Sequence, residues 1–148
     1  MPCHSAFQKL RSRVVPALKV EVQEYRHIQT GAIHYHFAAD NPENVFLVAF
    51  RTPPTDSRGV THILEHCVLC GSEKYPVRAP YFMMRKRSLA TYMNAFTSAD
   101  WTAYPFASQI HKDYFNLLDV YLDAVFFATL NPLDFAQEGH RLTINDDG

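Results

Sequence analysis

Two histidines and a glutamate within five consecutive residues have the types and spacing of a hydrolytic metal site. They are His62, Glu65 and His66. On an α-helix each residue turns about 100°, so His66 lies about 40° around the axis from His62 and one turn along it. Both imidazoles can therefore bind one metal ion, and Glu65, about 60° to the other side of His62, can reach a water on that metal. Because hydrolytic zinc sites use neutral imidazoles and a nearby carboxylate, the spacing predicts a Zn2+ site on a helix.

The alternative is that these side chains met by chance on an amphipathic helix. Eight histidines in 148 residues make such a coincidence less rare than usual. The order H-x-x-E-H is nearly the mirror image of the H-E-x-x-H order, in which the glutamate lies beyond the second ligand. The elements around the three residues have to decide between the two interpretations.

Composition limits the classes of protein and partner. With 148 residues, 47% of them hydrophobic, the chain can bury the core of one domain. A net charge of −1 gives no excess of cations for phosphate contacts, and residues 85–87 (Arg-Lys-Arg) read as a solvated helix face. The longest apolar run, residues 120–130, contains Asp123 and is shorter than the roughly 20 residues of a membrane span. We expect a soluble protein with neither nucleic acid nor membrane as a partner.

Three cysteines, an odd number, suit a reducing compartment. Cys67 and Cys70 form a C-x-x-C directly after the second histidine. A structural zinc site would need a second ligand pair, and a redox motif would be expected where a strand meets a helix. We therefore expect buried thiols that fill gaps in the core.

The N-terminal segment is basic. Lys9, Arg11, Arg13 and Lys19 precede the first acidic residue, Glu21, which is typical of an organelle transit peptide. The same residues can form a short N-terminal element of the mature domain, and we favour this second interpretation. We expect a cytoplasmic protein, bacterial in origin, with the mitochondrial matrix as the alternative.

Periodicity indicates the elements that precede the histidine pair. Residues 19–25 and 33–37 alternate apolar and polar, which predicts a β-hairpin. His34 and His36 fall on one face of it, and we interpret them as belonging to its wetter face rather than as a metal pair. Residues 45–50 are continuously apolar, which predicts a strand buried on both faces.

The elements that follow include the helix that carries the motif. Asp56 or Ser57 is the predicted cap of that helix. Further elements are predicted as a helix at 83–93, strands at 94–98 and 102–106, and a helix at 110–126 that Ser108 caps and Pro132 follows. Strands followed by mixed helices and strands predict an α+β fold, with helices packed on one face of a mixed or antiparallel sheet.

Several separate motifs, in this order along the chain, resemble the pitrilysin-type (M16, inverzincin) zinc metallopeptidases, and within them the presequence protease branch. The resemblance covers roughly residues 7–142. The motifs are Phe-Arg-Thr-Pro-Pro (50–54), the H-x-x-E-H residues, Leu-Cys-Gly-Ser (69–72), Lys-Tyr-Pro-Val (74–77), Asn-Ala-Phe-Thr (94–97), Tyr-Pro (104–105), residues 119–127 and Gln-Glu-Gly (137–139). The resemblance implies an M16-like (LuxS/MPP-like) first domain, of which residues 1–148 would be a single partial domain.

The resemblance also implies roles for individual residues. His62 and His66 would be zinc ligands, and Glu65 would be the general base that takes a proton from a water on the metal. Asn94, Ala95, Phe96 and Thr97 would form a strand whose edge pairs with an extended substrate. Substrates of similar enzymes are unfolded peptides, such as cleaved targeting sequences.

One ligand of the family pattern is missing from this chain. A catalytic zinc needs three protein ligands, and in the presequence protease branch the third is a glutamate in an Asn-Glu-Met-Lys-Gly stretch that this sequence lacks. Glu138 lies at a comparable distance from His66, but its Gln-Glu-Gly setting matches a different family position. We therefore expect a truncated first domain whose partners are peptide substrates and the remaining domains of an M16 enzyme.

Three functions remain open from the sequence. The first is a zinc metalloendopeptidase of which this chain holds the motif-bearing portion. The second is a non-catalytic structural or interaction module of the same fold. The third is a fragment that binds zinc weakly through two ligands. The presence of His62, Glu65 and His66 together favours the first.

Overall fold

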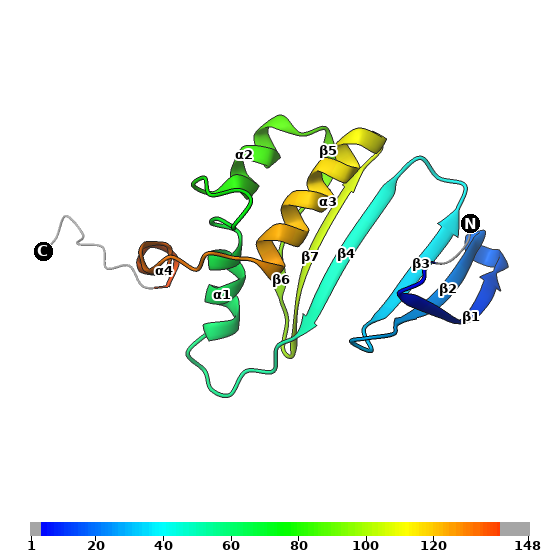
Figure 1. Cartoon of the computed structure of the whole chain (residues 1–148), viewed down its shortest axis with the longest axis horizontal. Helices are drawn as coiled ribbons and strands as arrows, with labels where there is room; N and C mark the ends of the chain where they lie inside the picture. Colours follow the sequence, from blue (N-terminus) through cyan, green and yellow to red (C-terminus); the bar gives the residue numbers. More distant parts are fainter. Residues whose placement is uncertain (1–3, 140–148) are drawn as a thin grey trace, which may run out of the picture. The chain divides into compact units, whose positions relative to one another are not determined.

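The N-terminal part of the chain is a small antiparallel sheet. A computed structural model describes residues 4–139, which form two compact units divided between Pro42 and Glu43. In the first unit the strands β1 (Phe7–Val15), β2 (Val20–His27) and β3 (Ile33–Ala39) pair in that order (Figure 1). The predicted hairpin is confirmed, with Tyr25 opposite His34. Lys9, Arg11 and Arg13 of the basic segment lie on strand β1, and Lys19 follows the short 3-10 helix η1 (Pro16–Leu18). That the whole chain is one partial domain stays a prediction.

The second unit is a four-stranded antiparallel sheet with helices on one face, which confirms the α+β prediction. Its strands run in the order β4-β7-β5, and β6 also pairs with β7. In Figure 1 the helices α1, α2 and α3 lie to the same side of β4 and β7. Its elements are β4 (Asn44–Arg51), α1 (Val60–Val68), α2 (Pro80–Arg87), β5 (Ala90–Met93), β6 (Phe96–Thr97), β7 (Trp101–Ser108), α3 (His111–Phe126) and α4 (Pro132–Glu138).

The core lies between β7 and α3. Phe106 of β7 is fully buried and contacts Tyr121 of α3, with ring centroids 5.0 Å apart. Leu117, one turn before Tyr121 on α3, is also fully buried. Large aromatic and aliphatic side chains gain the most from such burial, about 1.5–3 kcal/mol each. The middle of the apolar stripe predicted for residues 110–126 therefore faces this core, whereas its ends, Ile110 and Phe126, are exposed. Strand β7 is the central strand because it pairs with β4, β5 and β6.

The prediction that residues 45–50 are buried on both faces is wrong. Val45 is 65% exposed and Leu47 is 52% exposed, whereas Phe46 packs on Phe106 with centroids 5.3 Å apart. The cause is the position of β4, which pairs only with β7 among the described strands and has helices over one face. A continuous apolar run does not distinguish a central strand from an edge strand with one apolar outer face.

The helix predicted over residues 83–93 is only partly correct. Helix α2 has Pro80 at its first turn and ends at Arg87, and its C-cap Ser88 has an extended backbone. The remaining residues form β5, in which Ala90 lies opposite Ser108 of β7. Pairing with the central strand therefore overrides the local helical preference of this segment.

The helix ends also differ from the predictions. Helix α1 has Gly59 as N-cap, and the Asp56 carboxylate accepts from the Arg58 backbone N–H instead of capping it. Ser108 is not the cap of α3 but donates its hydroxyl proton to Asp113. Helix α4 was not predicted, because Pro132 was interpreted as a stop rather than as a first-turn residue. No helix within residues 4–139 is long and apolar enough to cross a membrane.

Candidate metal centre

Helix α1 separates the three motif residues onto two sides. Glu65 is buried, with 5% of its surface exposed, and lies on the side of α1 that faces β6 and β7. His62 and His66 are exposed on the neighbouring side. The helix begins at Val60, directly after its N-cap Gly59, whose φ of 73° lies in the left-handed region. The structure thus presents two imidazoles to solvent and holds the carboxylate beneath them.

The two histidines meet in the geometry of a shared metal. Their Nε2 atoms are 3.3 Å apart and their ring planes are inclined by 74°. Two nitrogens that each lie 2.0–2.1 Å from one tetrahedral zinc ion are separated by about 3.3–3.4 Å. The donor atoms therefore fit as a pair of zinc ligands, as the i, i+4 spacing predicts.

Glu138 contacts the other nitrogen of the same ring. Its Oε2 is 2.9 Å from His66 Nδ1, and its Oε1 accepts from Gln137 Nε2 at 2.8 Å. The Arg78 guanidinium donates to the Gln137 side chain at 2.7 Å and helps to hold this end of α4. A carboxylate on the second ring nitrogen orients a ligating histidine and fixes its tautomer.

In this position Glu138 does not replace the third zinc ligand. Its carboxylate lies on the Nδ1 side of the His66 ring, away from the edge that faces His62. Within residues 4–139 the structure contains no group of three or more His, Cys, Asp or Glu side chains arranged to hold a metal ion. The described residues thus provide two donors of the three that a catalytic zinc requires.

The carboxylate of Glu65 is held by a threonine. Thr97 of β6 donates its hydroxyl proton to Glu65 Oε2 at 2.6 Å. The resemblance to the family implies that Thr97 belongs to a substrate strand, and no pattern in the sequence predicts this contact. Burial and the Glu65 charge raise the pKa of the neighbouring Tyr104 well above its usual range. Glu65 therefore lies in a buried setting with a defined hydrogen-bond partner.

The predicted substrate strand is only partly a strand, since β6 covers Phe96–Thr97, and its residues divide into two sets. The Asn94 and Ser98 backbone N–H groups donate to Pro105 and Trp101 of β7. In an antiparallel pair alternate residues face the partner, so the backbone groups of Ala95 and Thr97 point to the opposite edge. That edge has no paired strand among the described residues. The Ala95 N–H already donates to the Asn94 side-chain oxygen at 3.0 Å, so the Thr97 backbone and the Ala95 carbonyl, rather than all four residues, offer groups to a peptide.

The remaining two residues of that segment face the sheet. Besides its pairing with β7, Asn94 accepts a hydrogen bond from the Tyr121 hydroxyl on its carbonyl, at 3.3 Å. The Phe96 ring packs against Trp101, with centroids 5.2 Å apart. These contacts fix the position of the edge strand beside α1.

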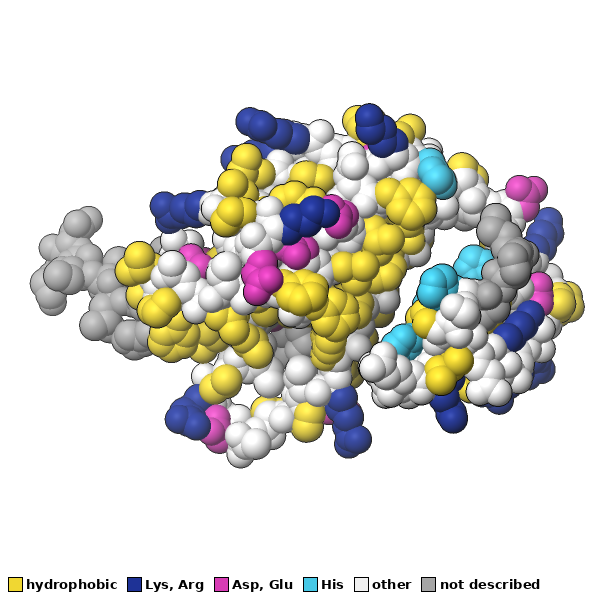
Figure 2. Space-filling view, viewed as in Figure 1, with side chains coloured by type: hydrophobic (Ala, Val, Ile, Leu, Met, Phe, Trp, Pro, Cys, Tyr) yellow, Lys and Arg dark blue, Asp and Glu magenta, His cyan; other side chains and the backbone are white. Residues whose placement is uncertain are grey.

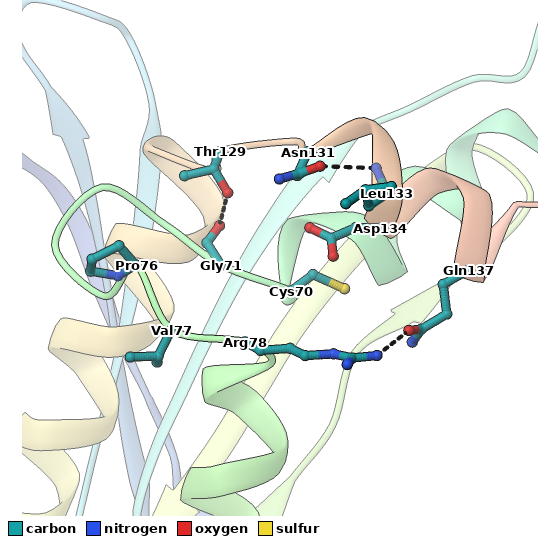
Figure 3. A pocket seen from close by; sticks show the side chains of 10 residues that line it. All are labelled: Cys70, Gly71, Pro76, Val77, Arg78, Thr129, Asn131, Leu133, Asp134 and Gln137. Carbon is teal, nitrogen blue, oxygen red and sulfur yellow. Dashed lines mark hydrogen bonds between the residues drawn. The ribbon is translucent and has the colours of Figure 1, made fainter.

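A hollow of about 520 Å³ lies between the loop after α1 and helix α4 (Figure 3). Cys70 and Asp134 line it, and none of the three motif residues does. Burial, with the nearby Asp134 and Glu138 carboxylates, raises the pKa of Cys70 to about 11, and burial also raises that of Cys67. Both cysteines are free; Cys67 is buried and Cys70 is half-buried. These thiols stay protonated at neutral pH, in agreement with a packing role.

The fold and the arrangement of the motif belong to one class of peptidase. The structure superposes on the crystal structure of pitrilysin with a TM-score of 0.77, over 91% of this chain and 15% of that one, at 19% identity. Residues 51–145 match the family model of insulinase (peptidase family M16). The chain belongs to peptidase family M16, a family of peptidases, which confirms the resemblance seen in the sequence.

Named relatives refine this placement within the family. The chain is 58% identical over 128 residues to "Presequence protease, mitochondrial" of Xenopus tropicalis, and 56% identical to the mouse protein of that name. The protein of the same name from Eremothecium gossypii is 51% identical over 138 residues. These matches cover 86–93% of this chain but only 12–14% of the relatives. The chain therefore spans about an eighth of their length.

Proposed function

We propose that this chain is the motif-bearing part of a zinc-dependent metalloendopeptidase that degrades unfolded peptides, such as cleaved targeting sequences. One observation carries the proposal: two histidine Nε2 atoms at the separation of zinc ligands lie on the helix that holds Glu65 against an edge strand. Similarity to the presequence proteases supports the choice of substrate class.

His62 and His66 would hold the zinc ion, and Glu138 would orient His66 through Nδ1. The third ligand lies outside residues 4–139 in this proposal, because the described residues supply only two donors. When bound, zinc supplies Lewis-acid polarisation of the scissile carbonyl and of water. The remaining steps depend on side chains that the structure describes.

Glu65 acts as the general base. Its Oε2 accepts the Thr97 hydrogen bond, so Oε1 is the oxygen that takes the proton of the attacking water. The same carboxyl group then donates that proton to the leaving amine. Because Glu65 is 5% exposed, bulk water does not compete for this carboxylate.

The peptide binds as an added strand at the edge of β6. The N–H and C=O of Thr97 and the C=O of Ala95 form the hydrogen bonds, so affinity depends on an extended main chain more than on side chains. Folded proteins cannot present such a strand, which limits the substrates to unfolded peptides. Asn94 and Phe96 support the edge through their contacts with α3 and β7.

The relatives' names also bear on location and partners. They are mitochondrial presequence proteases, which supports the mitochondrial matrix for this protein and does not support a bacterial cytoplasm. Because the chain spans about an eighth of these relatives, we propose the other parts of an M16 enzyme as its partners, together with peptide substrates.

The two-ligand site favours two alternatives to the enzyme. A chain that provides only two donors among its described residues suits a non-catalytic M16-like module, or a fragment that binds zinc weakly. Zinc titration separates these two, and peptide cleavage separates the enzyme from both.

The decisive experiment measures zinc content and cleavage of a quenched, unstructured peptide for the wild type and for Glu65→Gln. Stoichiometric zinc in both proteins, with cleavage only in the wild type, would support the enzyme. Weak zinc binding without cleavage by this chain alone would mean that its residues do not complete the site. The same result for the protein of full natural length would sink the enzyme and leave the non-catalytic alternative.

A further inference from the structure

We propose that Thr97 is a positioning residue that links peptide binding to the general base. Its side chain holds Glu65, and its backbone forms part of the edge where the peptide pairs. This inference rests on the proposed function and adds a residue whose side chain does not touch the reacting atoms. No other described side chain combines these two contacts.

The side-chain contact fixes the orientation of the carboxylate. Thr97 Oγ1 lies 2.6 Å from Glu65 Oε2, a short hydrogen bond of the charge-assisted kind. An ionised carboxylate can only accept, so the Thr97 proton points at Glu65. With one oxygen held in this way, the carboxylate plane cannot rotate freely and its second oxygen keeps a constant direction.

Two further hydroxyls, those of Thr102 and Thr52, form a row with the Thr97 hydroxyl. Thr102 of β7 lies directly opposite Thr97 in the pairing register, with their Oγ1 atoms 3.3 Å apart. The Thr102 hydroxyl is in turn 2.7 Å from that of Thr52, the residue after β4. Since Thr97 gives its only proton to Glu65, it can only accept from Thr102. A β-branched side chain has few χ1 rotamers, and this row of hydroxyls selects the one that meets Glu65.

The backbone groups of Thr97 point away from β7. The N–H and C=O of Thr97 point to the unpaired edge, because the neighbours Phe96 and Ser98 face β7. Strand β6 is only two residues long and is followed by a tight turn. A peptide that pairs with Thr97 adds hydrogen bonds to this short strand and so immobilises the residue that holds the base. Binding of substrate and orientation of Glu65 are thereby coupled.

The test compares Thr97→Val with Thr97→Ser in the zinc-loaded protein of full natural length. Valine keeps the shape and the backbone of Thr97 but removes the hydroxyl, whereas serine keeps the hydroxyl. We expect Thr97→Val to lower kcat by about 10-fold to 100-fold, as for a misplaced catalytic group, with KM and zinc content unchanged. Thr97→Ser should retain most of the wild-type kcat, because its hydroxyl can still reach Glu65.

A matched control is available on the neighbouring strand. Thr91 of β5 also donates its hydroxyl proton to a carboxylate, that of Glu43, away from the motif helix. Thr91→Val therefore removes the same type of bond by the same substitution and should leave kcat, KM and zinc content at wild-type values.

The outcomes distinguish a failure of this inference from a failure of the proposed function. A wild-type kcat in Thr97→Val would overturn this inference while leaving the proposed function intact. Equal losses in Thr97→Val and Thr97→Ser would also overturn it, because the hydroxyl would not be the cause. A zinc-loaded wild-type protein that cleaves no peptide would instead overturn the proposed function, and this inference with it.

Discussion

Glu65 is a charged side chain in a place where charged side chains are rare. It is 5% exposed, and a buried carboxylate costs several kcal/mol unless hydrogen bonds stabilise its charge. Thr97 supplies one such bond. Glu65 lies one turn before the buried Val68 on the same helix. A buried carboxylate with a fixed hydrogen-bond partner suits the general base that we propose.

The orientation of His66 by Glu138 leads to a prediction. Glu138→Gln removes the negative charge beside Nδ1 but keeps the size of the side chain. Loss of such an outer partner lowers metal affinity by about 10-fold to 100-fold. Competition with a chromophoric chelator would measure this change. The control is Asp134→Asn, which removes a charge from the same helix without a contact to His66, and equal affinity losses in both variants would contradict the orienting role.

The buried thiol of Cys70 predicts a pH effect. Its pKa is raised to about 11 from an ordinary value of 9.0, so the folded state keeps the proton that the unfolded chain loses. Stability from this group is complete below about pH 9 and falls as the pH rises towards 11. Cys70→Ser should therefore flatten the alkaline decline in urea midpoint between these values. An unchanged decline would show that other groups cause it.

At the scale of elements, the start of the motif helix depends on one glycine. Gly59 has φ of 73° and forms the N-cap of α1, with open space where a Cβ would lie. Gly59→Ala should cost about 1 kcal/mol of stability through backbone strain alone. Gly59→Asn should cost less, because asparagine tolerates the left-handed region. Urea unfolding of both variants measures the difference, and equal costs would exclude the backbone as the cause.

The two faces of β4 give a second prediction at this scale. Leu47 is 52% exposed on the outer face, so Leu47→Lys should change the free energy of unfolding by no more than about 0.5 kcal/mol. Phe106→Ala, in the fully buried core opposite Phe46, should cost about 3–5 kcal/mol. A large loss in Leu47→Lys would mean that the outer face of β4 is covered in solution.

The sequence predicts elements well where a single period dominates. The hairpin, the helix of residues 111–126 and the meeting of His62 with His66 all follow from spacing along one element. Predictions failed where a distant partner decides the outcome. Strand β5 exists because Ala90 pairs with Ser108, and no local signal separates the outer face of β4 from a buried one.

The residues of the candidate site also differ in how far they can be predicted from local sequence. The three motif residues are recognisable from their spacing, whereas the partners of His66 and Glu65 lie 72 and 32 residues further along the chain. One local signal in the sequence does indicate such a partner: Asn131 followed by Pro132 is a cap and first-turn pair that predicts helix α4, and hence the approach of Glu138.

At the scale of the molecule, exposed apolar side chains predict self-association. Leu133 and Phe135 of α4 are 76% and 57% exposed, and Phe126 and Phe127 at the end of α3 are 57% and 54% exposed. Figure 2 shows hydrophobic side chains on the surface near α4 and along α3. Apolar surface of this extent usually contacts another protein surface. The 148-residue chain by itself should associate as its concentration rises.

Sedimentation velocity over a range of concentrations would measure this association. Leu133→Gln combined with Phe135→Gln should reduce it without loss of helix α1, since both side chains point to solvent. A monodisperse wild-type chain at high concentration would contradict the prediction.

The late position of β7 in the chain has a consequence for synthesis. Asn44 at the start of β4 pairs with Ser108, 64 residues later, so β4 emerges from the ribosome long before its partner. At about 5–20 residues per second, this apolar segment waits roughly 3–13 seconds without a strand to pair with. Stalled nascent chains that end before residue 101 should therefore be cut by protease within β4 and bind chaperones there, and chains that extend past α3 should do neither.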